Sequence, residues 1–69
     1  MTTHTKTMLR VTQWKTLTET LNRDIDRMIQ RFLDSGGERE DLEYYNLKRI
    51  QRIAKALDDA IQNKINYLS

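Results

Sequence analysis

The chain has 69 residues, of which 38% are hydrophobic and 32% are charged, and its formal net charge is +2. It contains no cysteine and a single histidine, His4, which excludes disulfides, thiolate metal sites and histidine-based metal sites. Twelve basic residues nearly balance ten acidic ones, whereas a dedicated DNA-binding domain usually has a stronger basic bias.

Residues 1–11 are expected to form a flexible N-terminal tail, because residues 1–7 combine low helix propensity with no apolar anchor. Residues 8–13 are ambiguous, since Met8 and Val11 fit an early helical turn while Leu9 and Val11 fit a short strand. This start lacks the apolar core of a signal peptide, and no apolar run approaches the ~20 residues of a membrane span. We therefore expect a cytoplasmic protein that makes no contact with a membrane.

A first helix is predicted over about residues 12–35, with Thr12 as its N-cap. Its apolar positions are separated by steps of three and four residues and form an eleven-residue repeat, which is typical of a nearly straight helix. They are Trp14, Leu17, Leu21, Ile25, Met28 and Phe32. The glycine pair at 36–37 is expected to end the helix and to form the turn, because glycine readily adopts the left-handed conformation that closes a helix.

A second helix is predicted over about residues 38–68, and the acidic residues among 38–43 favour a helix start there because the helix dipole attracts negative charge. Its apolar stripe consists of Leu47, Ile50, Ala54, Leu57, Ile61, Ile65 and Leu68. A short turn between two long helices predicts an antiparallel hairpin. We therefore expect a single all-α domain over residues 12–69, an antiparallel two-helix hairpin.

Further apolar residues flank the two stripes, and a lone hairpin would leave them largely wetted. A domain of this size buries only about 60% of the surface of its unfolded chain and is marginal alone. We therefore expect a homo-oligomer, a homodimeric four-helix bundle, whose function is that of a small regulatory or adaptor protein with a protein partner. The expected interface residues are Ile29, Leu33, Leu42, Tyr45, Ile53 and Ala60.

A row of arginines offers an alternative function. Arg23, Arg27 and Arg31 recur every four residues, and in an antiparallel hairpin Arg49 is expected near the level of Arg23 on the same flank. The planar guanidinium suits phosphate, so the row is a candidate anion site for a nucleic acid or a nucleotide. The other interpretation is a solvated face that is balanced by Asp24, Asp26 and Asp34 along the same helix.

Catalytic chemistry is not expected. The only histidine is His4, near the N-terminus, so the serines and threonines of the helical domain have no histidine base to activate them. The neighbouring carboxylates Asp58 and Asp59 diverge on a helix and lack the spacing of a di-iron site. The sequence therefore predicts a protein without catalytic residues, metal or cofactor.

Three families share short features with the chain. The order of possible strand, helix, turn and helix resembles ribbon-helix-helix repressors, which would place Lys6, Arg10 and Thr12 within reach of DNA bases. The run from Leu57 to Ala60 resembles the second helix of phage hairpins that sequester cyclic-nucleotide immune signals, without the tryptophan that follows it there. The same region is similar to the aspartyl-phosphate phosphatase hairpins of spore formers, with Ala54 in place of their serine. None of these matches identifies a family.

Overall fold

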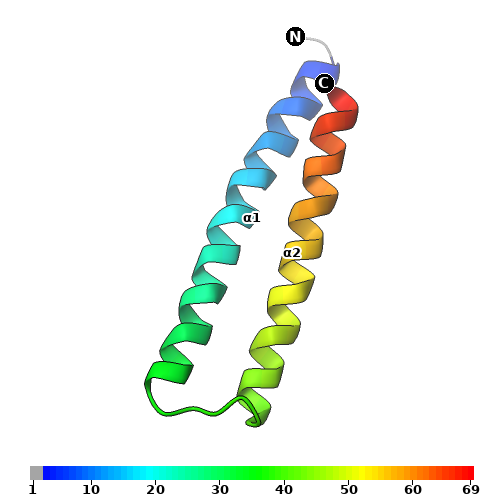
Figure 1. The fold of residues 1–69 in the computed structure, drawn as a ribbon. Helices are drawn as coiled ribbons and strands as arrows, with labels where there is room; N and C mark the ends of the chain where they lie inside the picture. The colour runs from blue at the N-terminus through cyan, green and yellow to red at the C-terminus, as the bar shows by residue number, and fades with distance from the viewer. Residues whose placement is uncertain (1–2) are drawn as a thin grey trace.

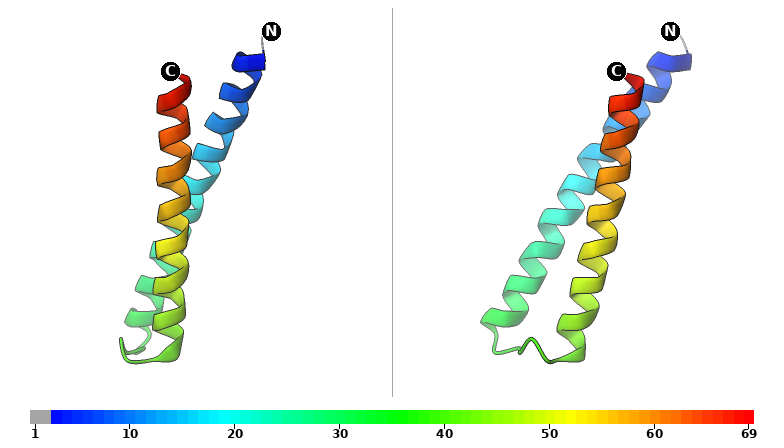
Figure 2. Two further views of the ribbon diagram at one scale, coloured as in Figure 1. Left: turned by 90° about the vertical axis from the view of Figure 1, so that its right-hand side faces the viewer. Right: turned by 45° about the vertical axis from the view of Figure 1, so that its right-hand side comes forward.

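In a computed structural model, which describes residues 3–69, the chain forms two long helices that lie side by side in antiparallel orientation (Figure 1). Helix α1 spans Thr3–Asp34 and α2 spans Leu42–Leu68. The hairpin measures 52 × 15 × 13 Å, and its axes are inclined to one another, as the views in Figure 2 show. The prediction of an all-helical hairpin is confirmed.

The N-terminal segment is helical, which corrects the expected tail over residues 1–11 for the part from residue 3 onward; residues 1 and 2 lie outside the described part. Val11 is 1% exposed against α2 and supplies the apolar anchor that residues 1–7 lack. Leu9 also lies within α1, so the strand of a ribbon-helix-helix protein is not formed there. Thr12 lies inside the helix instead of capping it, and its hydroxyl donates to the Met8 carbonyl at 2.7 Å.

The end of α1 is a Schellman motif. Gly36 has φ of +97°, and its amide donates to the Leu33 carbonyl at 3.2 Å while the Gly37 amide donates to the Phe32 carbonyl at 2.9 Å. Both glycines are required, because Gly36 occupies the left-handed region and a Cβ at Gly37 would overlap the Phe32 ring. The glycines therefore end α1, as the sequence predicts.

The connection is longer than the predicted two-residue turn, because α2 begins at Leu42 instead of near Glu38. Asp41 is the N-cap residue with extended backbone, and its carboxylate accepts a hydrogen bond from the Glu38 amide at 2.9 Å. The Asp41 amide in turn donates to the Glu38 carbonyl at 3.0 Å. This local turn takes up residues that the acidic composition alone would assign to the helix.

The contact between the helices, here called the seam, follows a seven-residue repeat on both of them, typical of antiparallel helix pairs. On α1 the seam consists of Val11, Lys15, Thr18, Asn22, Ile25, Ile29 and Phe32. On α2 it consists of Tyr44, Leu47, Gln51, Ala54, Asp58, Ile61 and Ile65. The core is centred on four buried residues near the turn, namely Ile25, Ile29, Leu47 and Ala54.

The predicted apolar stripe of α1 is not the seam, which corrects the expected core. Of its six residues, Ile25 is buried and Phe32 is partly buried, whereas the other four are about half exposed or more. On α2 more of the predicted stripe is buried: Leu47, Ala54 and Ile61 are buried, whereas Ile50 and Leu57 are exposed. The seam includes polar residues that pair across it, and these allow the strongest apolar stripe to face outward.

Candidate interaction surface

The seam contains a cluster of polar side chains that bond to one another between the two helices. The Asp58 carboxylate accepts a hydrogen bond from Lys15 Nζ at 2.7 Å and another from Thr18 Oγ1 at 2.8 Å. The hydrogen bond from Lys15, followed by that from Thr18, lowers the pKa of Asp58 below its ordinary value. Because the donors come from α1 and the acceptor from α2, these bonds fix how the two helices align.

Asn22 continues the polar layer by one turn. Its Nδ2 donates to the Thr18 carbonyl at 2.8 Å and, across the seam, to the Ala54 carbonyl at 3.3 Å. Its Oδ1 is buried and has no hydrogen-bond partner among the described residues. A further, exposed hydrogen bond between the helices runs from Gln51 Nε2 to Asp26 Oδ1 at 2.6 Å. The hairpin interior is therefore held by polar contacts as well as by apolar packing.

The apolar residues excluded from the seam share one position relative to it. Each of them comes one residue before a seam residue, so that Leu21 precedes Asn22 and Leu57 precedes Asp58. Since an α-helix turns by about 100° per residue, all of them lie on the same flank of their helix. We call this set the apolar face: Trp14, Leu17, Leu21 and Met28 on α1, and Ile50, Ile53 and Leu57 on α2.

The two halves of the apolar face lie on the same side of the hairpin. A groove of about 400 Å³ is lined by Trp14 and Leu17 from α1 and by Leu57 and Ile61 from α2, with Thr18 at its floor in the seam. The seven side chains of the face are between 46% and 66% exposed. Both helices therefore contribute apolar side chains to one side of the hairpin, and these meet in this groove, while Asp24 lies on the same flank between Leu21 and Met28.

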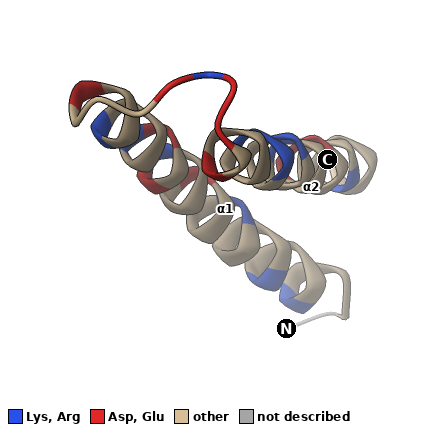
Figure 3. Ribbon diagram, turned by 90° about the horizontal axis from the view of Figure 1, so that it is seen from below, with Lys and Arg blue, Asp and Glu red and all other residues tan. Residues whose placement is uncertain are grey.

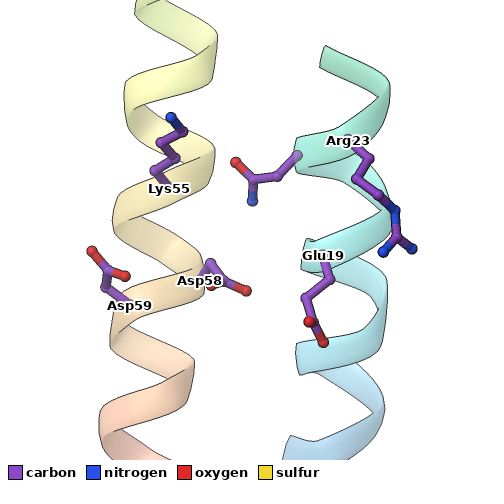
Figure 4. Close-up of a pocket in the computed structure, with 6 residues that line it drawn as sticks. Glu19, Arg23, Lys55, Asp58 and Asp59 are labelled. Atoms are coloured by element: carbon purple, nitrogen blue, oxygen red, sulfur yellow. The ribbon is translucent and has the colours of Figure 1, made fainter. Parts of the chain in front are cut away.

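Residues one position after the seam lie on the opposite side of the hairpin, and this side is polar around the middle of the two helices. In the middle of the hairpin, for the seam residues within 18–25 and 47–58, the residue one position after each of them is charged, as Arg23 follows Asn22 and Lys55 follows Ala54. A cleft of about 360 Å³ lies on this side between Glu19 and Arg23 of α1 and Lys55 and Asp59 of α2. Figure 4 shows Asp58 directed toward α1 within this cleft, whereas the Arg23 side chain turns away from α2. The two sides of the hairpin thus differ sharply in polarity.

Two residues predicted at an interface lie within the hairpin, which corrects that assignment. Ile29 is buried in the core, and Leu33 packs against the core as a partly buried residue, because both lie toward α2 on the seam side of α1. The other four, Leu42, Tyr45, Ile53 and Ala60, are exposed, and their part in an interface stays a prediction. Ile53 belongs to the apolar face.

The arginines predicted to act together are separated by the fold. Arg27 lies midway between the seam residues Ile25 and Ile29, so it faces away from α2. Arg49 lies midway between Leu47 and Gln51 and faces away from α1 for the same reason. The expected alignment of Arg49 with the row on α1 is therefore not formed.

The row on α1 is also interrupted by acidic residues. Asp24 lines the same surface hollow as Arg23 and Arg27. Its carboxylate weakens the positive potential that a polyanion would need. Whether the row binds an anion stays a prediction.

Among residues 3–69, no group of three or more histidine, cysteine or carboxylate side chains is arranged to hold a metal ion. No helix in this part of the chain has the length and apolar character needed to cross a membrane. Comparison with known proteins finds no family model, no curated relative and no solved structure that matches this chain. The most distinctive surface feature of the described residues is the apolar face, with its seven large, half-exposed side chains.

Proposed function

We propose that this chain is a small, non-enzymatic regulatory or adaptor protein that acts through protein–protein contacts and self-associates through its apolar face. In the assembly that we propose, two hairpins bring their apolar faces together and form a homodimeric four-helix bundle. The observation that carries the proposal is the apolar face itself, seven large side chains on one side of the hairpin that are each about half exposed.

Over part of α1, the side chains of the apolar face are more hydrophobic than the side chains that face α2. A large aliphatic or aromatic side chain contributes about 1.5–3 kcal/mol when it is fully buried. On α1 the seam uses Lys15, Thr18 and Asn22 over the stretch where the apolar face presents Trp14, Leu17 and Leu21. Burial of the face against another chain is therefore a larger source of stability over this stretch than the contact within the hairpin, and contiguous apolar surfaces of this kind mark interaction sites.

The test compares two leucine-to-aspartate variants by sedimentation equilibrium and circular dichroism. Leu17 belongs to the apolar face, whereas Leu9, which is 51% exposed, lies two residues from Val11 and faces away from α2. We expect the wild-type chain and Leu9→Asp to be dimers at micromolar concentration, and Leu17→Asp to be a monomer. A wild-type chain that stays a folded monomer up to millimolar concentration, or a Leu17→Asp variant that dimerises as the wild type does, would refute the proposal.

A further inference from the structure

We infer that the occupant of the apolar face is a second copy of this chain in antiparallel orientation, so that the turn of each hairpin lies beside the chain termini of the other. The inference rests on the proposed self-association and adds the orientation of the two copies. The two ends of the hairpin carry opposite charge, and the apolar face lies between them.

The end of the hairpin that holds the turn is acidic. Residues 31–43 contain five acidic side chains and two basic ones, Arg31 and Arg39. The five acidic residues, all exposed, are Asp34, Glu38, Glu40, Asp41 and Glu43. In Figure 3 the connection between the helices is drawn largely in red, the colour of Asp and Glu positions.

The opposite end, where the chain begins and ends, is basic. Residues 1–18 and 60–69 contain four Lys and Arg residues and no acidic residue. Lys15 is paired with Asp58, which leaves Lys6, Arg10 and Lys64 exposed and free of ion pairs within the described chain. The hairpin is therefore polarised along its long axis, although its net charge is close to zero.

The charges at the basic end continue the line of the apolar face. Arg10 comes one residue before Val11, and Lys64 comes one residue before Ile65, so both occupy the flank that carries the face. On the same flank at the other end lie Glu43, one residue before Tyr44, and Arg31, one residue before Phe32. A partner that covers the apolar face is therefore flanked by both charged ends.

The spacing of these charges fits a second copy. Leu21 on α1 and Ile53 on α2 lie near the middle of the apolar face. Lys64 lies 11 residues from Ile53, about 16 Å along the helix, and Glu43 lies 10 residues from it in the other direction, about 15 Å. If two faces are superimposed about Leu21 in antiparallel orientation, each basic end meets the acidic turn of the other copy. In parallel orientation, the acidic turns would meet each other and so would the basic ends, which is unfavourable.

The orientation is measured by the distance between spin labels. The chain has no cysteine, so a nitroxide attached to Glu40→Cys marks the turn of each copy without further changes. In an antiparallel dimer the two turns lie at opposite ends, so the labels should be about 40 Å apart or more, whereas in a parallel dimer they should lie within about 20 Å.

A long distance supports the inference. A short distance in a dimeric sample overturns the orientation and leaves the proposed self-association standing. A sample that sedimentation shows to be monomeric at millimolar concentration overturns both.

A charge-reversal pair provides a second test. Lys6→Glu with Arg10→Glu removes the complementarity at both contacts of an antiparallel dimer, and we expect the dissociation constant to rise roughly tenfold at low salt. The matched control is Lys48→Glu with Lys55→Glu, which makes the same change in net charge on the polar side. An equal rise in both double variants, or a wild-type dimer that tightens as salt is added, would contradict the antiparallel arrangement.

Discussion

Thr18 and Asp58 meet at 2.8 Å between the two helices, and Lys15 adds a second hydrogen bond to the same carboxylate at 2.7 Å. This cluster is a polar contact that aligns α1 with α2 between the apolar layers of Val11 and Ile61 on one side and of Ile25 and Leu47 on the other. Its loss should affect stability more than the loss of an exposed charge nearby.

The first prediction concerns Asp58 and its neighbour. Asp58→Ala should lower the melting temperature by several degrees, because it leaves Lys15 without its carboxylate partner and Thr18 without its acceptor across the seam. Asp59→Ala is the control, since it removes the same charge from an exposed position. Thermal unfolding followed by circular dichroism measures both; equal melting temperatures for the two variants would contradict a structural role for Asp58.

The second prediction concerns acid. The pKa of Asp58 is lowered in the folded chain, so its ionised form is favoured by folding. The resulting stabilisation is fully present above the ordinary pKa of an aspartate, about 3.9, and is lost as the pH falls through the lower pKa of the folded state. Melting temperatures at a series of pH values should therefore fall less steeply below about pH 4 in Asp58→Asn than in the wild type; parallel curves would argue against it.

The third prediction concerns the end of α1. Gly36 has φ of +97° and open space around it, so Gly36→Ala should cost about 1–2 kcal/mol from backbone conformation alone. The control is Ser35→Ala, which removes only an exposed hydrogen bond to the Phe32 carbonyl. Denaturant unfolding measures the free energy of unfolding of each variant. A Gly36→Ala variant as stable as Ser35→Ala would mean that this turn tolerates another conformation.

The fourth prediction concerns Asn22. Its Oδ1 is buried without a hydrogen-bond partner among the described residues, and such an atom loses its hydration on folding without compensation. Asn22→Leu keeps the branching and the number of side-chain heavy atoms, and it should raise the free energy of unfolding by about 1 kcal/mol, because it removes a buried oxygen whose lost hydration is not compensated. A destabilised variant would show that the bond from Asn22 to the Ala54 carbonyl outweighs the unpaired oxygen.

The fifth prediction concerns the arginine row. Because Asp24 lies among the arginines and Arg49 faces another way, we expect no measurable binding of a short single-stranded RNA at physiological salt. Fluorescence anisotropy with a labelled oligonucleotide makes the measurement. Binding that weakens steeply with salt and with Arg27→Ala would favour the anion-binding function instead.

The hairpin could be predicted from the sequence because its signals are local. Two long stretches without proline or internal glycine favour helices. Gly36 and Gly37 are the two glycines of the sequence, and as adjacent glycines they indicate where the first helix ends. The start of α1 could not be predicted in the same way. Residues 3–7 are mostly threonine and histidine, which are weak helix formers, and the burial of Val11 comes from the folded hairpin and cannot be read from this local sequence.

The side of α1 that faces α2 differs from the predicted side for another physical reason. The apolar stripe from Trp14 to Met28 is the most hydrophobic on α1, and periodicity alone assigns the most hydrophobic stripe to the interior. The structure instead places Lys15, Thr18 and Asn22 there, because Asp58 and the Ala54 carbonyl on α2 accept their hydrogen bonds. The signal in the sequence is the seven-residue repeat in both helices. In the middle of the hairpin, most residues one position before this repeat are apolar, and those one position after it are charged.

This one-residue offset makes the helices sensitive to changes in length. An insertion of a single residue in the middle of α1, after Thr20, would turn everything before it by about 100°, which would bring the flank of Thr16 and Glu19 toward α2 and move Lys15 out of reach of Asp58. The same insertion in the connection between Gly37 and Asp41 leaves both helices in phase. Natural variation in length should therefore collect in the connection, while each helix keeps its residue count.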